Sequence, residues 1–309
     1  MFFRQLQYLV ALAKEEHFGR AAERCNVSQP SLSSAIKQLE FSLGVPIVLR
    51  GRRFLGFTDE GRRVIEWAER VIAQRDAMLV ELSGMRENYE GHMRLGAMPN
   101  SSPVLPLLSY LLAEKHPGVE VDIRFLGIEE TRLGLSNYAL DVGITYLQEQ
   151  ELEGLASLPI YVESLSLLVP DTEAYQELDS ITWADAADLP LCLLDPSMHE
   201  RRIVDEAFAK VGKTPRPSVV CSDSILNLIF HVMFAELVTV IPQHFIRMPG
   251  KFPGVRLLDL VEPEISQQVG IVWSPSEPIM PMASVMVSIV KDLKNSGALE
   301  SRLGELAMV

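Results

Sequence analysis

The sequence of 309 residues predicts an α/β protein in three parts: an N-terminal winged helix-turn-helix, a long linker helix, and a domain of two α/β subdomains. Three observations lead to this prediction. Residues 18–43 have the pattern of two short helices joined by a tight turn, residues 58–85 form one proline-free amphipathic stretch, and strand-like runs alternate with helical runs from Met93 onward. The expected boundaries are 1–58, 59–90 and 91–309, the last with subdomain I at about 91–162 and 268–309 and subdomain II at about 163–267.

The opening segment predicts a helix that braces the helix pair, with one apolar face made of Phe2, Leu6, Leu9 and Val10. In the pair, Ala21 and Ala22 are small enough for a second helix to pack closely across the first. Asn26 suits the turn, Ser28 can cap the next helix, and Pro30 falls in its first turn, where a missing N–H costs nothing. A helix is therefore expected to begin at Ser28.

The second helix of the pair has an apolar and a polar face. Its apolar residues recur at helical spacing and are expected to be buried: Leu32, Ala35, Ile36, Leu39 and Leu43. Its polar side chains can hydrogen-bond to base edges and phosphates. The candidate DNA contacts on this helix are Gln29, Pro30, Ser31, Ser33, Ser34 and Lys37. A solvated helical hairpin would show the same pattern, so the helix pair alone leaves both alternatives open.

A β-hairpin is expected directly after the pair. The stretch 45–57 has two apolar runs around a basic turn, which is the pattern of a wing beside a helix-turn-helix. Guanidinium groups in such a turn can reach phosphates or a minor groove. The candidate contacts here are Arg50, Arg52 and Arg53.

The charge distribution supports a nucleic-acid partner independently. The whole chain is acidic, at net −13, but residues 1–57 hold eight Lys/Arg against four Asp/Glu, and the remainder holds 20 against 37. The N-terminal part is therefore +4 and the rest −17. This asymmetry suits a protein whose N-terminal module lies on DNA while its body faces elsewhere.

These residues match a known pattern. From Phe3 to about Met85 the chain resembles the LysR-type transcriptional regulators, on AA-x-x-x-x-VSQPSLS at 21–33, IKQLE at 36–40, LGVP at 43–46 and TDEG at 58–61. Weaker similarity continues beyond, including LDVGI at 140–144. The resemblance implies binding of double-stranded promoter DNA, a C-terminal effector domain similar to periplasmic solute-binding proteins, a homodimer or homotetramer, and contact with RNA polymerase if the protein is an activator.

The linker helix is expected to run from Thr58 to about Met85. Its apolar residues, Ile65, Ala68, Ile72, Leu79 and Leu82, follow a heptad-like step that only Arg75 breaks. Such a stripe could pack on its own domain, but the DNA-binding region looks too small to cover it. A partner chain is the better cover, and the resemblance implies a dimer formed through this helix.

Strands and helices alternate in the remaining chain. Strands are expected at 93–98, 119–126 and 140–146, with helices at 104–115 and 129–137, which predicts a parallel sheet. A second series has strands at 164–170, 191–195, 217–222 and 237–242, with helices at 200–211 and from Ser224. A strand at 266–274 and a helix at 282–295 should return to the first half.

Ligands of open α/β sheets bind beyond the carboxyl ends of the strands, where helix N-termini offer free N–H groups. The candidate effector contacts at such places are Asn100, Ser101, Ser102, Gly127, Ile128, Thr145, Ser197, Met198 and His199. A Ser or Asn at a helix start is also a common cap. Donors and helix dipoles converging in one place would suit a small anion such as a short carboxylate.

No catalytic or cofactor motif competes with this interpretation. The chain has no GxSxG, GxxxxGK[ST] or HExxH motif, so an enzyme carrying an accessory basic domain is the weaker hypothesis, and no cofactor or metal is expected. The three cysteines contain no CxxC pair; Cys192 and Cys221 lie in strand-like runs of one subdomain and leave a redox-responsive regulator as the alternative.

The expected location is the cytoplasm. The opening residues lead straight into an amphipathic helix without the pattern of a secretory signal. The most apolar stretch, 224–241, contains Asn227, His231 and Glu236, which argues against a membrane span.

Overall fold

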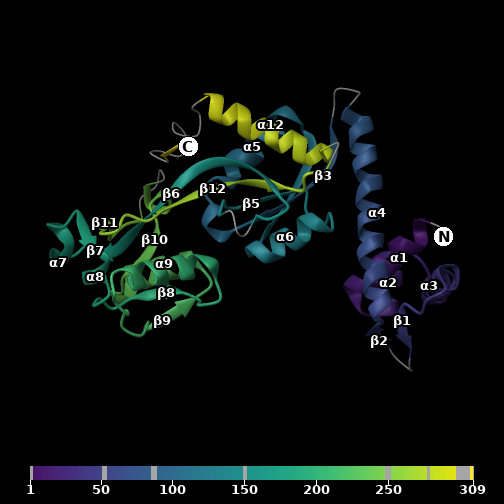
Figure 1. Ribbon diagram of the computed structural model, residues 1–309, viewed down its shortest axis with the longest axis horizontal. Coiled ribbons are helices and arrows are strands. Elements are labelled where there is room, and N and C mark those ends of the chain that lie inside the picture. Colours follow the sequence, from purple (N-terminus) through teal and green to yellow (C-terminus); the bar gives the residue numbers. More distant parts are fainter. Residues whose placement is uncertain are drawn as a thin grey trace. The chain divides into compact units, whose positions relative to one another are not determined.

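The computed structural model describes residues 3–50, 54–84, 89–148, 152–247, 252–276, 279–296 and 307–308 (Figure 1). The chain forms two compact units, one of residues 1–91 and 133–140 and the other of residues 92–132 and 141–309. Among the described residues, no helix is both long and apolar enough to cross a membrane.

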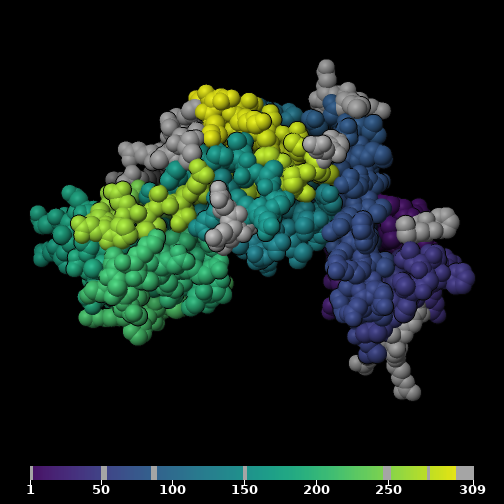
Figure 2. All heavy atoms as spheres, in the orientation of Figure 1, coloured from purple at the N-terminus to yellow at the C-terminus, as the bar shows by residue number. Residues whose placement is uncertain are grey.

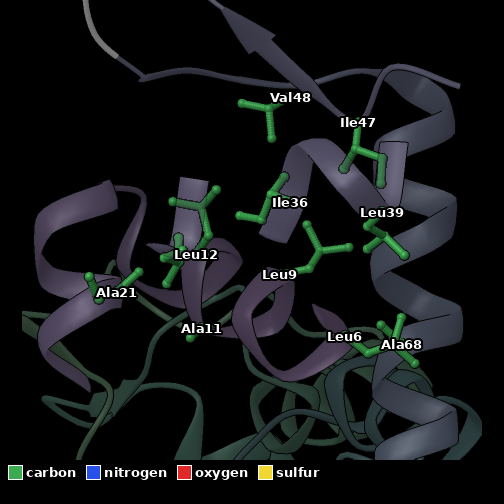
Figure 3. Close-up of a cluster of buried hydrophobic side chains, with 12 residues drawn as sticks. Leu6, Leu9, Ala11, Leu12, Ala21, Ile36, Leu39, Ile47, Val48 and Ala68 are labelled. Atoms are coloured by element: carbon green, nitrogen blue, oxygen red, sulfur yellow. The ribbon is translucent and has the colours of Figure 1, made fainter. Parts of the chain in front are cut away.

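The N-terminal region is a winged helix-turn-helix, as expected. It contains α1 (Phe3–Glu15), α2 (Phe18–Arg24), α3 (Gln29–Leu43) and an antiparallel hairpin of β1 (Val48–Arg50) and β2 (Phe54–Phe57). Apolar side chains from all three helices and from the hairpin strand β1 meet in one core (Figure 3). The fully buried members include Leu9, Leu12, Ala21, Leu32, Ile36 and Leu39.

Local signals explain where α3 begins and ends. Asn26 has a positive φ of 53° in the turn, and the Ser28 hydroxyl accepts a hydrogen bond from the Ser31 N–H. Gly44, with a φ of 72°, takes the left-handed conformation that ends the helix. Leu43 was expected to be buried and is instead 40% exposed, because it lies in the last turn, beyond the reach of α1 and α2.

The linker helix α4 spans Asp59–Gly84. Thr58 caps it by accepting a 2.8 Å hydrogen bond from the Gly61 N–H, and Asp59 and Glu60 occupy its positive first turn. The expectation that its whole apolar stripe lacks cover in its own domain is wrong. Ala68 is 1% exposed, and Ile65 and Ile72 pack against the core of the helix-turn-helix, because α1 lies along this part of α4.

The C-terminal domain is built on one large sheet with the strand order β4-β3-β5-β12-β6-β11-β7, and β10 and β13 also pair with β6. Its first half contains β3 (Glu90–Ala97), β4 (Gly118–Phe125), β5 (Val142–Tyr146) and β12 (Ser266–Trp273). The helical segments of this half are the 3₁₀ turn η1 (Pro99–Ser101), α5 (Leu105–Lys115), α6 (Ile128–Ser136) and α12 (Pro281–Ser296). Figure 1 shows α5 and α12 side by side over one face of the sheet.

The second half contains β7 (Ser180–Thr182), β8 (Cys192–Leu194), β9 (Val220–Ser222), β10 (Thr239–Pro242) and β11 (Val255–Val261). Its helices are α7 (Glu173–Gln176), α8 (Trp183–Ala186), α9 (His199–Lys210), α10 (Ile225–Ala235) and α11 (His244–Arg247). The buried face of α10 forms a separate core with β6, β8 and β10. This half is the green lobe in Figure 2.

Strand β6 (Ala156–Pro170) is longer than expected and belongs to both halves. Residues 156–164 pair with β12, and residues 165–170 pair with β10 and β11. The sequence predicted a strand only from Ser164. Pro159, which lacks an N–H, lies in the part of the strand that was not predicted. The structure accommodates Pro159 at a register shift opposite Gly270. Strand β13 (Ala307–Met308) pairs with this same strand at Tyr161 and Val162.

Candidate functional site

The polar face of α3 is accessible. The exposed candidates on this helix are Gln29, Pro30, Ser31, Ser34 and Lys37, whereas Ser33 is half-buried. The opposite face carries the fully buried Leu32, Ile36 and Leu39. The hydroxyl oxygens of Ser31 and Ser28 lie 2.8 Å apart, so Ser31 also takes part in the cap of its own helix. One face of α3 is thus anchored in the core while the other faces outward.

The hairpin is fixed to α3 by a side chain that the sequence analysis missed. Glu40 Oε1 accepts hydrogen bonds from the backbone N–H groups of Ile47 and Val48, at 2.9 and 3.0 Å. Phe54 stacks edge-on against Phe18 with ring centroids 6.2 Å apart. Of the three wing arginines, Arg50 ends β1, but its side chain and all of Arg52 and Arg53 lie outside the described residues.

A second missed feature orders α2. The carboxylate of Glu15 forms ion pairs with Arg24 at 2.8 Å and with Arg20 at 3.5 Å. The hydrogen bond from Arg24 lowers the pKa of Glu15. Glu15 and Arg24 lie nine residues apart on two different helices, so the spacing within one helix could not predict this pair.

The C-terminal domain contains a pocket of about 470 Å³ between strand ends of subdomain I and the start of α9. Six of the nine predicted effector contacts line it: Gly127, Ile128, Thr145, Ser197, Met198 and His199. The wall is completed by Met98, Pro99, Phe125, Leu126, Glu129, Glu130, Tyr146, Glu200, Arg202 and Asp223. The carboxyl ends of β3, β4 and β5 therefore contribute to one site, as expected for an open α/β sheet.

The other three predicted contacts do not line this pocket. The Ser101 hydroxyl is buried and donates to the Met98 carbonyl at 2.7 Å, and the Ser102 hydroxyl donates to the Pro99 carbonyl at 2.6 Å. Asn100 is 2% exposed, and its Nδ2 donates to the hydroxyl of Tyr146 at 2.8 Å. The two serine hydroxyls thus bond to the backbone in and beside η1, and Asn100 connects η1 to β5.

Behind the pocket lies a group of buried polar side chains on four different elements, η1, β5, β6 and α11. The Tyr146 hydroxyl and Asn100 Nδ2 both donate to Glu163 Oε1, and Nε2 of His244 donates to the Asn100 carbonyl at 2.9 Å. Burial raises the pKa of Glu163 to about 8 and lowers that of His244 to about 4. Both groups are therefore uncharged at neutral pH. Sequence reasoning missed Glu163 because it lies within a strand, away from any turn or helix start.

The backbone donors expected to hold an anion already have acceptors within the chain. The Gly127 N–H, which precedes α6, donates to Oε2 of Glu130 at 3.0 Å. Ser197 donates to Asp195 through both its N–H, at 2.9 Å, and its hydroxyl, at 2.6 Å. The carboxyl of Glu200 accepts from its own N–H in the first turn of α9. The chain's own carboxylates thus occupy the positions that an anionic ligand would take.

The cysteine pair is not arranged as a disulfide. In the parallel pair β8 and β9, Cys192 lies opposite Val220, whereas Cys221 lies opposite Leu193. Neighbouring residues of a strand point to opposite faces, so the two thiols lie on opposite faces of this pair. Cys192 is fully buried and Cys221 is exposed. The described residues also contain no group of three or more His, Cys, Asp or Glu side chains that could hold a metal ion.

A winged helix-turn-helix with an exposed polar recognition face, followed by an α/β domain with a ligand-sized pocket, defines a DNA-binding regulator with an effector domain. Residues 3–62 match the family described as "Bacterial regulatory helix-turn-helix protein, lysR family", and residues 86–294 match the "LysR substrate binding domain". The chain therefore belongs to the LysR family of transcriptional regulators.

Known relatives agree with this assignment. The chain is 28% identical over 280 residues to the "DNA-binding transcriptional dual regulator OxyR" of Escherichia coli K12, which covers 90% of this chain and 91% of that protein. A solved full-length OxyR variant from Pseudomonas aeruginosa is 28% identical, covers 94% of this chain and 98% of that one, and has a TM-score of 0.71. CbnR in complex with its target DNA shares the fold, with a TM-score of 0.70 at 21% identity over 94% of this chain and 99% of that one.

Proposed function

We propose that this LysR-family regulator reads promoter DNA through the exposed face of α3. Gln29 and Ser33 contact base edges, and Pro30, Ser31 and Ser34 lie against the groove. Lys37 and the wing residues Arg50, Arg52 and Arg53 hold phosphates. The observation that carries this proposal is the exposed polar face of α3, which a fully buried apolar face keeps turned outward.

Operator binding by alanine variants tests the base contact. Gln29→Ala should cost about 1–3 kcal/mol on the true operator and little on random DNA. Arg53→Ala should weaken binding to both DNAs and reduce the salt slope by about one. Gln7→Ala, at an exposed position of α1, is the matched control. Equal losses for Gln29→Ala on both DNAs would show that Gln29 does not read bases.

The proposed effector site is the pocket between the strand ends of subdomain I and α9. Its volume of about 470 Å³ lies within the range of small-molecule sites. Thr145 and the segment 197–199 contact the ligand, whereas Asn100, Ser101 and Ser102 support the pocket wall from behind. An anion such as a short carboxylate would compete with Glu130, Glu200 and Asp195 for the local N–H groups, so this class of effector is disfavoured.

The active form is proposed to be a homodimer or tetramer, with α4 as a seam, that acts on promoter DNA in the cytoplasm and contacts RNA polymerase if it activates transcription. Several relatives are named hydrogen peroxide-inducible genes activators, which makes peroxide sensing the second candidate. The positions of Cys192 and Cys221 on opposite faces of β8 and β9 argue against a disulfide between them.

A further inference from the structure

The pocket wall carries more carboxyl groups than basic groups. Four carboxyl side chains line it, and one guanidinium opposes them: Glu129, Glu130, Glu200 and Asp223 against Arg202. Two of the carboxylates are already engaged within the chain, since Glu129 pairs with Arg132 at 2.7 Å and Glu130 accepts from the Gly127 N–H. Glu200 and Asp223 form no ion pair with another side chain in the part of the chain that the structure describes.

Glu200 is the buried member of this set. The residue is 8% exposed and lies in the first turn of α9, and among the described residues its carboxyl hydrogen-bonds only to its own N–H. Arg202 on the same helix donates instead to Nδ1 of His199 at 2.8 Å. Arg202 acts on Glu200 as a nearby positive charge, but among the described residues the two side chains form no ion pair. The other ionisable neighbours, Glu163 and Tyr146, supply no positive charge at any pH. A buried carboxyl without a cation in direct contact is costly, so this position would gain from a positive ligand.

The remaining wall is apolar and partly aromatic. Met98, Leu126, Ile128 and Met198 line the pocket together with the rings of Phe125 and Tyr146. Hydrocarbon surface can bury the body of a ligand, and aromatic faces attract cations. The pocket thus combines a deep carboxyl with apolar surface around it.

We propose that the effector of this regulator carries a cationic group, a primary ammonium or guanidinium, that binds the Glu200 carboxylate, and a short hydrocarbon or aromatic body that packs against Phe125, Met98 and Met198. This inference rests on the proposed effector role of the pocket and names the ligand class for it. The ammonium supplies direct hydrogen-bond donors to Glu200 and a positive charge in addition to that of Arg202.

Two matched ligand series on the full-length protein test the ligand class. Benzylamine, benzyl alcohol and benzoate share one body and differ in charge, as do 1,4-diaminobutane, 1,4-butanediol and succinate. Ligand-observed NMR titration measures the dissociation constant of each. The cation of each series should bind at least about tenfold more tightly than its neutral and anionic counterparts.

Glu200→Gln keeps the shape of the side chain and removes its charge. This variant should lose the preference for the cations, by roughly tenfold or more, and its thermal unfolding midpoint should not fall, because the change removes a buried charge. Glu206→Gln makes the same change at an exposed position of α9 outside the pocket and should leave the preference intact.

Three outcomes would overturn the cation assignment. They are tighter binding of benzoate or succinate, an unchanged preference in Glu200→Gln, and no detectable binding of either cation at about 10 mM, which is above a dissociation constant of 1 mM. Operator binding separates this failure from that of the wider proposal. A chain that binds its operator specifically but ignores the cations remains a regulator with another ligand class. Loss of specific DNA binding by the wild-type protein would instead contradict the proposed function itself.

Discussion

Glu163 is a carboxyl group buried inside the C-terminal domain. It is 1% exposed on β6, and its Oε1 accepts from Tyr146 and Asn100 while its Oε2 has no hydrogen-bond partner among the described residues. Desolvation is the main cause of its raised pKa of about 8, and the nearby Glu200 adds to it. The other ionisable or charged groups around it are Tyr146, Tyr161 and His244, none of which neutralises a negative charge at neutral pH. A protonated Glu163 is thus part of the folded state.

This predicts a stability that decreases at high pH. Because the pKa of Glu163 is higher in the folded chain than in the unfolded one, its contribution is fully present below about pH 4.5 and is lost as the pH rises through about 8. Between pH 6 and 9, the free energy of unfolding of the wild type should fall by roughly 2–3 kcal/mol more than that of Glu163→Gln, which resembles the protonated form. Urea denaturation at the two pH values measures this. Parallel declines in both proteins would show that Glu163 is not the titrating group.

The two thiols of the C-terminal domain should differ in reactivity. Burial raises the pKa of Cys192 to about 11, and its Sγ faces the Val238 carbonyl at 3.5 Å, whereas Cys221 is exposed. Under native conditions, iodoacetamide should modify Cys221 rapidly and leave Cys192 intact. Peroxide should produce no disulfide between them, as measured by intact and peptide mass spectrometry, and Cys221→Ser should remove the fast reaction. A Cys192–Cys221 disulfide in the oxidised protein would support the redox alternative.

The roles of single residues could be predicted from the sequence where they depend only on neighbouring residues. Ser28, Pro30 and Gly44 define the ends of α3 through chemistry that needs only neighbouring backbone. The direction of the Asn100 side chain depends on Tyr146 and Glu163, which are 46 and 63 residues away in the chain. No pattern at a helix start distinguishes a side chain that faces a ligand from one that faces a distant strand. For this reason residues 100–102 were predicted to line the pocket, whereas in the structure they lie behind it.

At the scale of elements, Glu40 connects α3 to the wing. Its carboxylate accepts the N–H groups of Ile47 and Val48 at the start of the hairpin. Glu40→Ala should lower the free energy of unfolding of the N-terminal region by about 1–3 kcal/mol, because two half-buried donors lose their acceptor. Glu40→Gln retains an acceptor oxygen and should cost clearly less. Differential scanning calorimetry measures both, and an equal loss in the two variants would contradict this role.

The exposed stripe of α4 predicts the dimer seam more narrowly than the sequence did. Its large apolar residues are Trp67, Val71, Met78, Leu79 and Leu82, with Trp67 at 63% and Met78 at 52% exposure. Positions 67, 71, 78 and 82 follow a heptad-like step, whereas Ile65, Ala68 and Ile72 pack on the helix-turn-helix core. Substitutions at the second group would damage folding and are unsuitable as tests of association.

Trp67→Glu combined with Met78→Glu should therefore separate the dimer, since the charges would lie in an apolar contact, and abolish tight operator binding. Sedimentation equilibrium gives the association state, and circular dichroism checks the fold. Asp76→Lys, an exposed charge reversal on α4 outside this stripe, should remain associated. A double variant that stays dimeric with wild-type operator affinity would rule out this seam.

For the whole molecule, the division of charge governs association with DNA. Residues 1–57 carry +4 and the rest of the chain −17, so attraction to phosphate is concentrated in the helix-turn-helix and its wing. Raising the salt from about 50 to about 200 mM should weaken operator binding of a dimer roughly a thousandfold or more. Fluorescence anisotropy measures this, and a shallow salt dependence would contradict the proposed phosphate contacts.

The order of elements was largely predictable at this scale, because apolar runs of period two alternate with runs of helical period. The joint between the subdomains was not. Strand β6 pairs with β10, β11, β12 and β13, all of which come much later in the chain. Pro159 also interrupts the strand pattern of β6 in the sequence. Strand β11 pairs both with β6 and with β7, so it depends on partners that no local pattern identifies.

The position of β12 has a consequence for biosynthesis. This strand lies between β5 and β6 in the sheet, yet it is made long after both, at residues 266–273. Until the ribosome has released it, the nascent chain carries β5 and the first half of β6 without the strand that joins them, and an unpaired apolar edge is a template for aggregation. A chain stopped by premature termination before residue 266 should hence be captured by chaperones or degraded, however well its DNA-binding region has already folded.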